Sequence, residues 1–112
     1  MNTLATAPLH LTAESLDTAL ATSNDRPVLI DFWAPWCGPC KAQGPILEQL
    51  AATEGERAVI AKLDTDEFPE AAAKHGIRAL PTLLVFRGGV EHARLVGLQS
   101  AASLSAALAA AR

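Results

Sequence analysis

The run Val28–Trp33 restricts the fold more than any other part of this sequence. It reads Val-Leu-Ile-Asp-Phe-Trp, so an extended strand here would be apolar on both faces except at Asp31. A strand of that kind is buried on both sides, as in the centre of a sheet that helices cover on either face. We therefore expect a layered α/β domain with this strand in its interior.

The rest of the chain alternates between strand and helix patterns. Short strands are predicted over 9–12, 58–64, 82–87 and 90–96, and helices over 13–21, 37–53, 66–76 and 101–111. The glycine pair at 88–89 is typical of a tight hairpin turn. The resulting order, β-α-β-α-β-α-β-β-α, predicts a mixed central sheet with helices on both faces.

Length and composition indicate one globular domain spanning residues 1–112. Half of the 112 residues (50%) are hydrophobic and 19% are charged, which is typical of a compact domain rather than a disordered chain. No repeat or low-complexity linker divides the sequence. The net charge is −3 and the nine basic residues are scattered, which argues against a nucleic-acid partner.

Hydropathy and the N-terminal residues give an expectation for localisation. No segment approaches the roughly 18 consecutive apolar residues of a membrane-spanning helix. Residues 1–8 lack the basic and long apolar regions of a secretory signal. We therefore expect a cytoplasmic protein that does not bind membranes, in a reducing compartment where structural disulfides are rare.

The two cysteines, Cys37 and Cys40, lie where the central strand gives way to the next helix. A C-x-x-C pair at such a junction is the redox form of the motif. As a structural bridge it would contribute roughly 2 kcal/mol, against about 3 for a fifteen-residue loop. As half of a zinc site it would need further ligands, and the histidines lie in three different predicted elements. Thiol chemistry is therefore favoured, and no metal is expected.

The start of a helix suits the two cysteines to different tasks. Its N-terminus carries partial positive charge and stabilises a thiolate, so Cys37 is expected to be the exposed nucleophile. Cys40, about one turn deeper, can attack a mixed disulfide on Cys37 and release the reduced substrate. Between them, Pro39 suits the first helical turn, and Gly38 keeps the approach to both sulfurs open.

Two charged residues stand in otherwise apolar strands. Asp31 would be costly to bury and should then have a raised pKa, unless it lies at a strand end in solvent. Lys62 belongs to the strand over 58–64, and pairing of neighbouring strands would bring it towards Asp31 and tune the ionisation of that acid. The alternative for Lys62 is a side chain that extends to the surface.

The segment Phe32–Lys41 resembles the active-site segment of thioredoxins almost residue for residue. The match extends from Leu11 to the last helix and includes Gly-Ile-Arg at 76–78, Pro-Thr-Leu at 81–83 and Val-Gly at 96–97. The resemblance implies the thioredoxin fold. It also implies a general protein-disulfide reductase, which maintains cytosolic protein thiols and donates electrons to reductive enzymes.

The same resemblance implies roles for residues around the dithiol. Asp31 would exchange a proton with Cys40, tuned by Lys62, and Pro81 would follow a cis peptide bond that leaves the Leu80 backbone free to pair with an extended substrate. Trp33 and Pro45 would be structural supports. The substrate-binding residues it implies are Trp36, Gly38, Pro39, Ala79, Leu80, Pro81, Gly97 and Leu98.

No bound cofactor is expected, because the electrons reside on the two sulfurs. The resemblance implies that a thioredoxin reductase regenerates the dithiol with electrons from NADPH, and that a monomer serves many disulfide-containing proteins. Two alternatives stay open. One is an oxidase or isomerase of an oxidising compartment, which usually carries other residues between the cysteines. The other is a binding module that uses the dithiol surface as a subunit or regulator.

Overall fold

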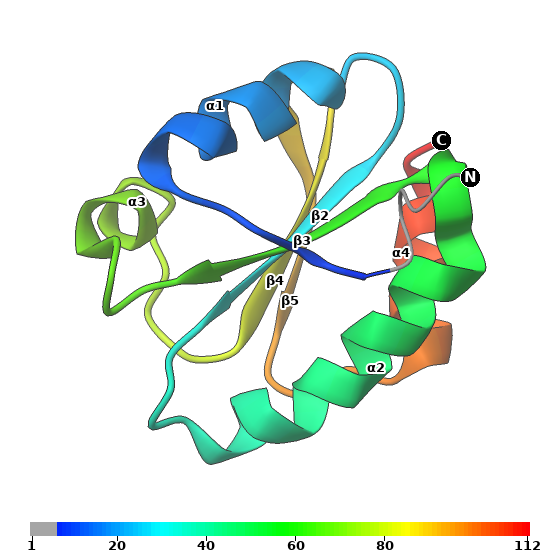
Figure 1. The fold of residues 1–112 in the computed structure, drawn as a ribbon. Coiled ribbons are helices and arrows are strands. Elements are labelled where there is room, and N and C mark those ends of the chain that lie inside the picture. The colour runs from blue at the N-terminus through cyan, green and yellow to red at the C-terminus, as the bar shows by residue number, and fades with distance from the viewer. Residues whose placement is uncertain (1–6) are drawn as a thin grey trace.

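The computed structural model describes residues 7–112 as one mixed five-stranded sheet between two layers of helices (Figure 1). The strands are β1 (Leu9–His10), β2 (Val28–Trp33), β3 (Val59–Asp64), β4 (Thr82–Arg87) and β5 (Val90–Val96). The helices are α1 (Ala13–Thr22), α2 (Gly38–Glu54), α3 (Pro69–Lys74) and α4 (Ala101–Ala110), with a short 3₁₀ turn at Gly55–Arg57. The predicted α/β class and order of elements are confirmed.

The strand β2 lies in the centre of the sheet, whose order is β1-β3-β2-β4-β5. It pairs parallel with β3 and antiparallel with β4, and β4 pairs antiparallel with β5. Every residue of β2 is buried except Trp33, which is half-buried. The run that is apolar on both faces therefore occupies the interior position that the sequence predicts.

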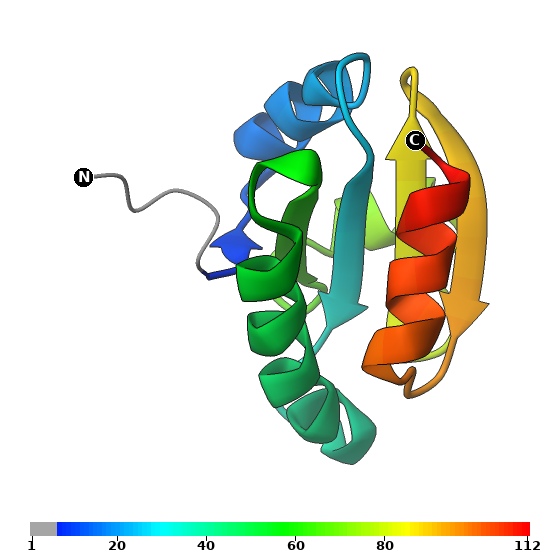
Figure 2. The same ribbon diagram turned by 90° about the vertical axis from the view of Figure 1, so that its right-hand side faces the viewer.

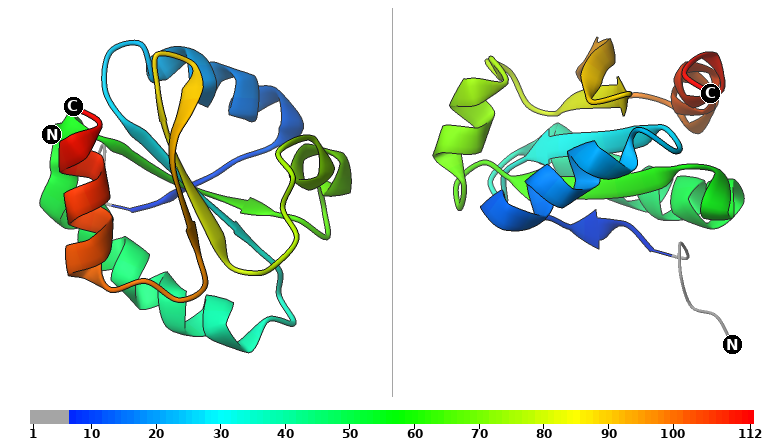
Figure 3. Two further views of the ribbon diagram at one scale, coloured as in Figure 1. Left: turned by 180° about the vertical axis from the view of Figure 1, so that it is seen from behind. Right: turned by 90° about the horizontal axis from the view of Figure 1, so that it is seen from above.

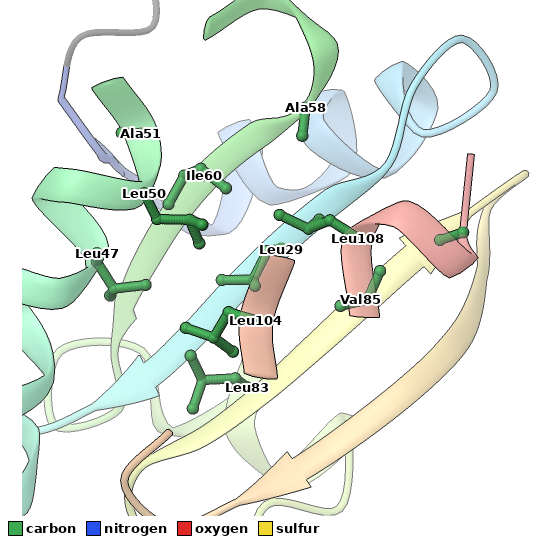
Figure 4. Close-up of a cluster of buried hydrophobic side chains, with 11 residues drawn as sticks. Leu29, Leu47, Leu50, Ala51, Ala58, Ile60, Leu83, Val85, Leu104 and Leu108 are labelled. Carbon is green, nitrogen blue, oxygen red and sulfur yellow. The ribbon is translucent and has the colours of Figure 1, made fainter. Parts of the chain in front are cut away.

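Alternation along β2 divides the interior into two apolar clusters. Leu29 packs on the face covered by α2 and α4, and Figure 4 shows it between leucines of these two helices. Ile30 and Phe32 face the opposite cluster, which α1 and α3 cover. Figures 2 and 3 show the two helical layers on either side of the sheet. Successive residues of one strand thus anchor both halves of the core.

Several element boundaries differ from the prediction by one to three residues. The strand expected over 9–12 ends at His10, because Thr12 caps α1 by accepting a hydrogen bond from the Ser15 N–H at 3.1 Å. The helix expected from residue 66 begins at Pro69, since the Asp64 side chain accepts hydrogen bonds from the two backbone N–H groups at 66–67 and folds them into a turn. The helix α2 begins at Gly38, with Cys37 as its N-cap.

Part of the domain and localisation predictions concerns residues 1–6, which lie outside the described residues. The single domain over 1–112 and the lack of a secretory signal in 1–8 therefore stay predictions. None of the helices within residues 7–112 is long and apolar enough to span a bilayer.

A buried carboxylate joins the end of α2 to the end of the chain. Glu54 is 4% exposed, and its Oε1 lies 2.7 Å from Nη2 of Arg112. The Ser105 hydroxyl of α4 donates to Oε2 at 3.5 Å, and Nη2 of Arg57 lies 4.0 Å from the same oxygen. These contacts compensate the charge of Glu54 and stabilise the packing of α2 beside α4.

Arg112→Ala should lower the free energy of unfolding by about 1–3 kcal/mol, because it leaves the buried Glu54 carboxylate with weaker compensation. Adding Glu54→Gln should recover part of that loss, since a neutral amide costs less to bury. Urea unfolding curves measure both effects. Glu48→Gln, a change of an exposed carboxylate on the same helix, is the control. An Arg112→Ala variant with the parent's midpoint would show that this ion pair does not stabilise the fold.

Candidate active site

Cys37 and Cys40 form a disulfide at the N-terminal end of α2, with Cα atoms 5.3 Å apart. The backbone N–H of Cys40 donates to Sγ of Cys37 at 3.2 Å. A backbone donor at a helix N-terminus stabilises negative charge on a sulfur, and the helix dipole adds to this. The geometry therefore favours the thiolate at Cys37 once the pair is reduced.

Cys37 is less accessible than the sequence predicted. It is 4% exposed and Cys40 is 3% exposed, so the expectation of an exposed Cys37 is wrong for this disulfide form. The reason is its N-cap position, where its sulfur is bonded to Cys40 and its N–H donates to the Ala34 carbonyl at 3.1 Å. The adjoining Gly38 and Pro39 are exposed, so the disulfide lies directly beneath an open surface.

The carboxyl of Asp31 is fully buried, and neither of its oxygens has a hydrogen-bond partner among the described residues. Burial raises the pKa of Asp31 to about 7, against an opposing effect of the Lys62 charge. Both protonation states are therefore populated near neutral pH, which suits a group that accepts and returns a proton. The solvated alternative for this residue is excluded by its burial.

Asp31 faces the same layer of the molecule as Cys40. Side chains alternate along a strand, so Asp31 shares a face with Leu29, and its β4 partner Leu83 lies on that face as well. Both leucines belong to the cluster that packs against α2 and α4. Cys40 lies on the buried side of α2. The acid and the second cysteine thus point into the space between the sheet and α2.

Lys62 is the register partner of Asp31 in the parallel β2–β3 pair. Its ammonium lies 4.5 Å from the centre of the Trp33 ring, a cation–π contact. No ion pair within 4.0 Å joins Lys62 to Asp31 in the described part of the chain, so the two interact through space, and this interaction lowers the pKa of the acid. Within residues 7–112, the ammonium therefore lies over the Trp33 ring and not in an ion pair with the carboxyl.

Apolar residues among those predicted to bind substrate, which we refer to as the rim, come from three separate segments: Trp36, Ala79 with Leu80, and Gly97 with Leu98. Trp36 is 69% exposed, and its indole N–H donates to the Asp66 carboxylate at 3.1 Å. Leu98, in the connection between β5 and α4, is 51% exposed. Leu80 is half-buried ahead of β4. Large exposed apolar side chains of this kind are typical of a protein-binding surface.

The peptide bond Leu80–Pro81 is cis, as the resemblance implied. Pro81 is buried and Ala79 is exposed beside it. The Pro81 carbonyl accepts a hydrogen bond from the Gly97 N–H at 2.8 Å, so the segment before β4 is joined to the segment after β5. These two parts of the predicted rim are therefore held together by the backbone.

A groove of about 340 Å³ continues the rim towards α3. Trp36 and Leu80 line one part of it, and Ala72, Ile77 and Arg78 line another. It is open to solvent and mainly apolar, with one cationic side chain.

The structure also places the supporting residues and reveals one that the sequence analysis missed. Pro45 lies inside α2, on its exposed side. Gln43, which the sequence analysis did not single out, is fully buried one turn after Cys40 and bonds to the backbone of Gln99. A polar residue on the apolar side of α2 was the available signal. No group of three or more His, Cys, Asp or Glu residues within 7–112 is placed to hold a metal ion.

The buried Asp31 gives stability a characteristic pH dependence. Its pKa in the folded protein, about 7, is above its ordinary value of 3.8, so the folded state binds more protons than the unfolded state between these values. The free energy of unfolding is therefore highest below pH 3.8. It falls as the pH rises from there through about 7.

Asp31→Asn should stabilise the oxidised protein at pH 8 by several kcal/mol, since each pKa unit corresponds to about 1.4 kcal/mol. The difference should shrink towards pH 4. Guanidinium unfolding of both proteins across this range measures it, with Asp17→Asn, an exposed carboxylate of α1, as the control. Parallel stability curves for the parent and Asp31→Asn would contradict the raised pKa.

The chain matches known proteins over nearly its whole length. The thioredoxin family model matches residues 7–110. A thioredoxin of Acidithiobacillus ferridurans is 44% identical over 102 residues, which cover 91% of this chain and 94% of that protein. A bifunctional thioredoxin reductase/thioredoxin of Mycobacterium leprae is 44% identical over 82 residues, 73% of this chain and 18% of that protein.

Among solved structures, a mutant thioredoxin from Halobacterium salinarum superposes with a TM-score of 0.86 at 35% identity, covering 99% of this chain and 96% of that one. These matches agree with the position of the Cys37–Cys40 pair at the N-terminal end of α2, the helix that follows β2. The chain therefore belongs to the thioredoxin family and is a thiol–disulfide oxidoreductase that reduces disulfides in proteins.

Proposed function

We propose that this protein acts in the cytoplasm as a monomeric, general electron donor to protein disulfides, and that a thioredoxin reductase regenerates it with electrons from NADPH. The observation that carries the proposal is the disulfide Cys37–Cys40 beneath an open apolar rim, with a buried acid of pKa about 7 in the layer below it. One redox pair, one proton-exchanging group and a surface with few charges suit repeated reaction with many partners.

In the proposed cycle, the Cys37 thiolate attacks one sulfur of a substrate disulfide. A mixed disulfide forms, and the other substrate sulfur leaves as a thiolate that takes a proton from water. Asp31, in its ionised form, accepts the proton of Cys40. The resulting Cys40 thiolate attacks the Cys37 sulfur, which forms the Cys37–Cys40 disulfide and releases the second substrate thiolate. Two electrons have then passed from the protein to the substrate.

Regeneration needs two electrons from outside the domain. The relative from Mycobacterium leprae, named as a bifunctional thioredoxin reductase/thioredoxin, supports a thioredoxin reductase as their source. Its name describes both activities in one polypeptide. By analogy, a reductase that uses NADPH would attack the Cys37–Cys40 disulfide of this chain and return it to the dithiol. Electron transport is then the exchange of two thiols for one disulfide, with no cofactor held by the domain.

Substrate binding is assigned to the rim and the groove that continues it. An extended substrate segment would pair with the backbone at Leu80, ahead of Pro81, as an added strand. Trp36 and Leu98 would contact apolar side chains on either side of the target disulfide. The small residues Gly38, Ala79 and Gly97 would let the substrate approach the Cys37 sulfur closely, with Pro39 beside them.

Insulin reduction coupled to NADPH oxidation by a thioredoxin reductase tests the cycle. The parent protein should support turnover. Cys40→Ser should instead accumulate a covalent adduct with the substrate that dithiothreitol releases, because the resolving thiol is gone. Cys37→Ser should form no such adduct and give no turnover. Adducts on Cys40 in the Cys37→Ser variant would reverse the assignment of the two thiols. Insulin reduction with dithiothreitol as the electron source, but not with NADPH and the reductase, would exclude that reductase as the electron source.

The proton role of Asp31 is tested by the rate at which the mixed disulfide is resolved. In the parent this rate should rise through about pH 7, as Asp31 ionises. Asp31→Asn should slow it by at least about tenfold at neutral pH and remove this step in the profile. Stopped-flow single turnovers between pH 6 and 8 measure it, and Asp17→Asn is again the control. An unchanged rate across this range would sink the assignment.

A further inference from the structure

Gln43 makes a two-point contact with the backbone of another segment. Its Nε2 donates to the Gln99 carbonyl at 3.0 Å, and the Gln99 N–H donates to its Oε1 at 2.8 Å. We refer to these two hydrogen bonds as the Gln43 clamp. Gln43 is fully buried, so water does not compete for its polar atoms. Two bonds to one residue fix both the distance and the orientation of Gln99 relative to α2.

The clamped residue in turn organises the connection between β5 and α4, which passes beside α2 in Figure 1. The side-chain nitrogen of Gln99 lies 3.3 Å from the carbonyl oxygens of both Val96 and Gly97 and donates to them. Its side-chain oxygen accepts from the Ser103 hydroxyl of α4 at 2.9 Å. Gln99 thus holds the turn over 96–99 in one shape and attaches it to α4.

Leu98 lies between two fixed points. On one side, Gly97 donates its N–H to the Pro81 carbonyl at 2.8 Å and has a φ of +90°, a conformation that favours glycine. On the other side, the Gln43 clamp holds Gln99. The exposed Leu98 side chain is therefore positioned relative to both α2 and the segment before β4. Without the clamp, Leu98 would lose its fixed position relative to α2, while the Gly97 bond and the Gln99 side chain would remain.

A glutamine at this position has two effects. Its two hydrogen bonds stabilise the fold, since an apolar side chain of similar length would leave the Gln99 N–H and carbonyl without these partners. An apolar side chain also cannot fix the backbone of Gln99. The distinctive consequence of Gln43 is therefore the position of the turn over 96–99.

We propose that Gln43 is a positioning residue for protein substrates: through the Gln43 clamp it fixes Leu98 beside the dithiol. The proposal rests on the role assigned above to Leu98 in the rim. A folded protein disulfide must contact the rim and the dithiol together, whereas a small disulfide needs only the dithiol. Loss of the clamp should therefore weaken binding of protein substrates and spare the thiol exchange itself.

The test compares insulin with dithionitrobenzoate, a small aromatic disulfide, as substrates of Gln43→Met. Methionine keeps the length of the side chain and removes both hydrogen bonds. The KM for insulin should rise roughly three- to tenfold, because Leu98 is no longer held in one position for contact with the substrate, and kcat should change much less. The ratio of kcat/KM for insulin to that for dithionitrobenzoate should fall by the same factor. Gln49→Met, the same change on the exposed side of α2, is the matched control.

Two further variants test the rim independently and replace Gln43→Met if it does not fold. Leu98→Ser tests the rim itself and should also raise the KM for insulin. Gln43→Leu removes the same two hydrogen bonds with a different apolar side chain, so it should raise the same KM. It replaces Gln43→Met if thermal unfolding shows that variant to be unfolded at the assay temperature, and an unchanged KM for Gln43→Leu would then overturn the proposal.

The pattern of results separates the possible failures. If Leu98→Ser raises the KM for insulin and Gln43→Met does not, Leu98 contacts the substrate but the Gln43 clamp does not position it. That result would overturn the proposal and leave the proposed function intact. If neither variant raises it, the assigned rim is wrong and the proposal fails with it. If Gln43→Met slows both substrates equally through kcat, Gln43 acts on the dithiol or on the fold, which also overturns the proposal.

Discussion

The burial of one carboxyl in the central strand is the constraint on which the rest of this structure depends. Asp31 has no hydrogen-bond partner among the described residues, and its removal from water raises its pKa to about 7. Folding must offset this cost with apolar packing. The leucine cluster on its own face and the cluster around Phe32 on the other face provide that packing. The same burial that is unfavourable for stability gives the carboxyl a pKa suited to proton exchange near neutral pH.

The position of Lys62 determines how strongly its positive charge compensates the buried charge of Asp31. A direct ion pair would lower the pKa of Asp31 further and make its carboxylate a weaker base towards the Cys40 thiol. Because the ammonium lies over the Trp33 ring, its charge lowers the pKa of the acid only in part, and burial remains the larger effect. Trp33 thereby has a tuning role in addition to its packing role. The balance between two opposing effects, rather than either alone, sets the pKa near 7.

The sequence predicted the parts of the structure that depend on local pattern. The two-faced apolar run of β2 and the junction that carries Cys37 followed from residue type and spacing, and the cis bond before Pro81 followed from the family resemblance. The features that it did not predict depend on specific bonds formed by individual side chains. The Asp64 carboxylate delays the start of α3, and the disulfide and N-cap geometry bury Cys37. Such contacts leave no periodic signal in the sequence.

The buried side of α2 connects the chemistry of this protein to its recognition surface. Cys40 lies on that side in the first turn, facing the layer that holds Asp31, and Gln43 follows one turn later. Any rotation of α2 that moved Cys40 relative to the sheet would also move the backbone of Gln99, since both are fixed to the same helix. Leu98, which precedes Gln99, would then shift together with the sulfurs rather than separately. A rigid helix with a buried polar side chain is thus enough to keep the substrate contacts in register with the thiols, although these segments are far apart in the sequence.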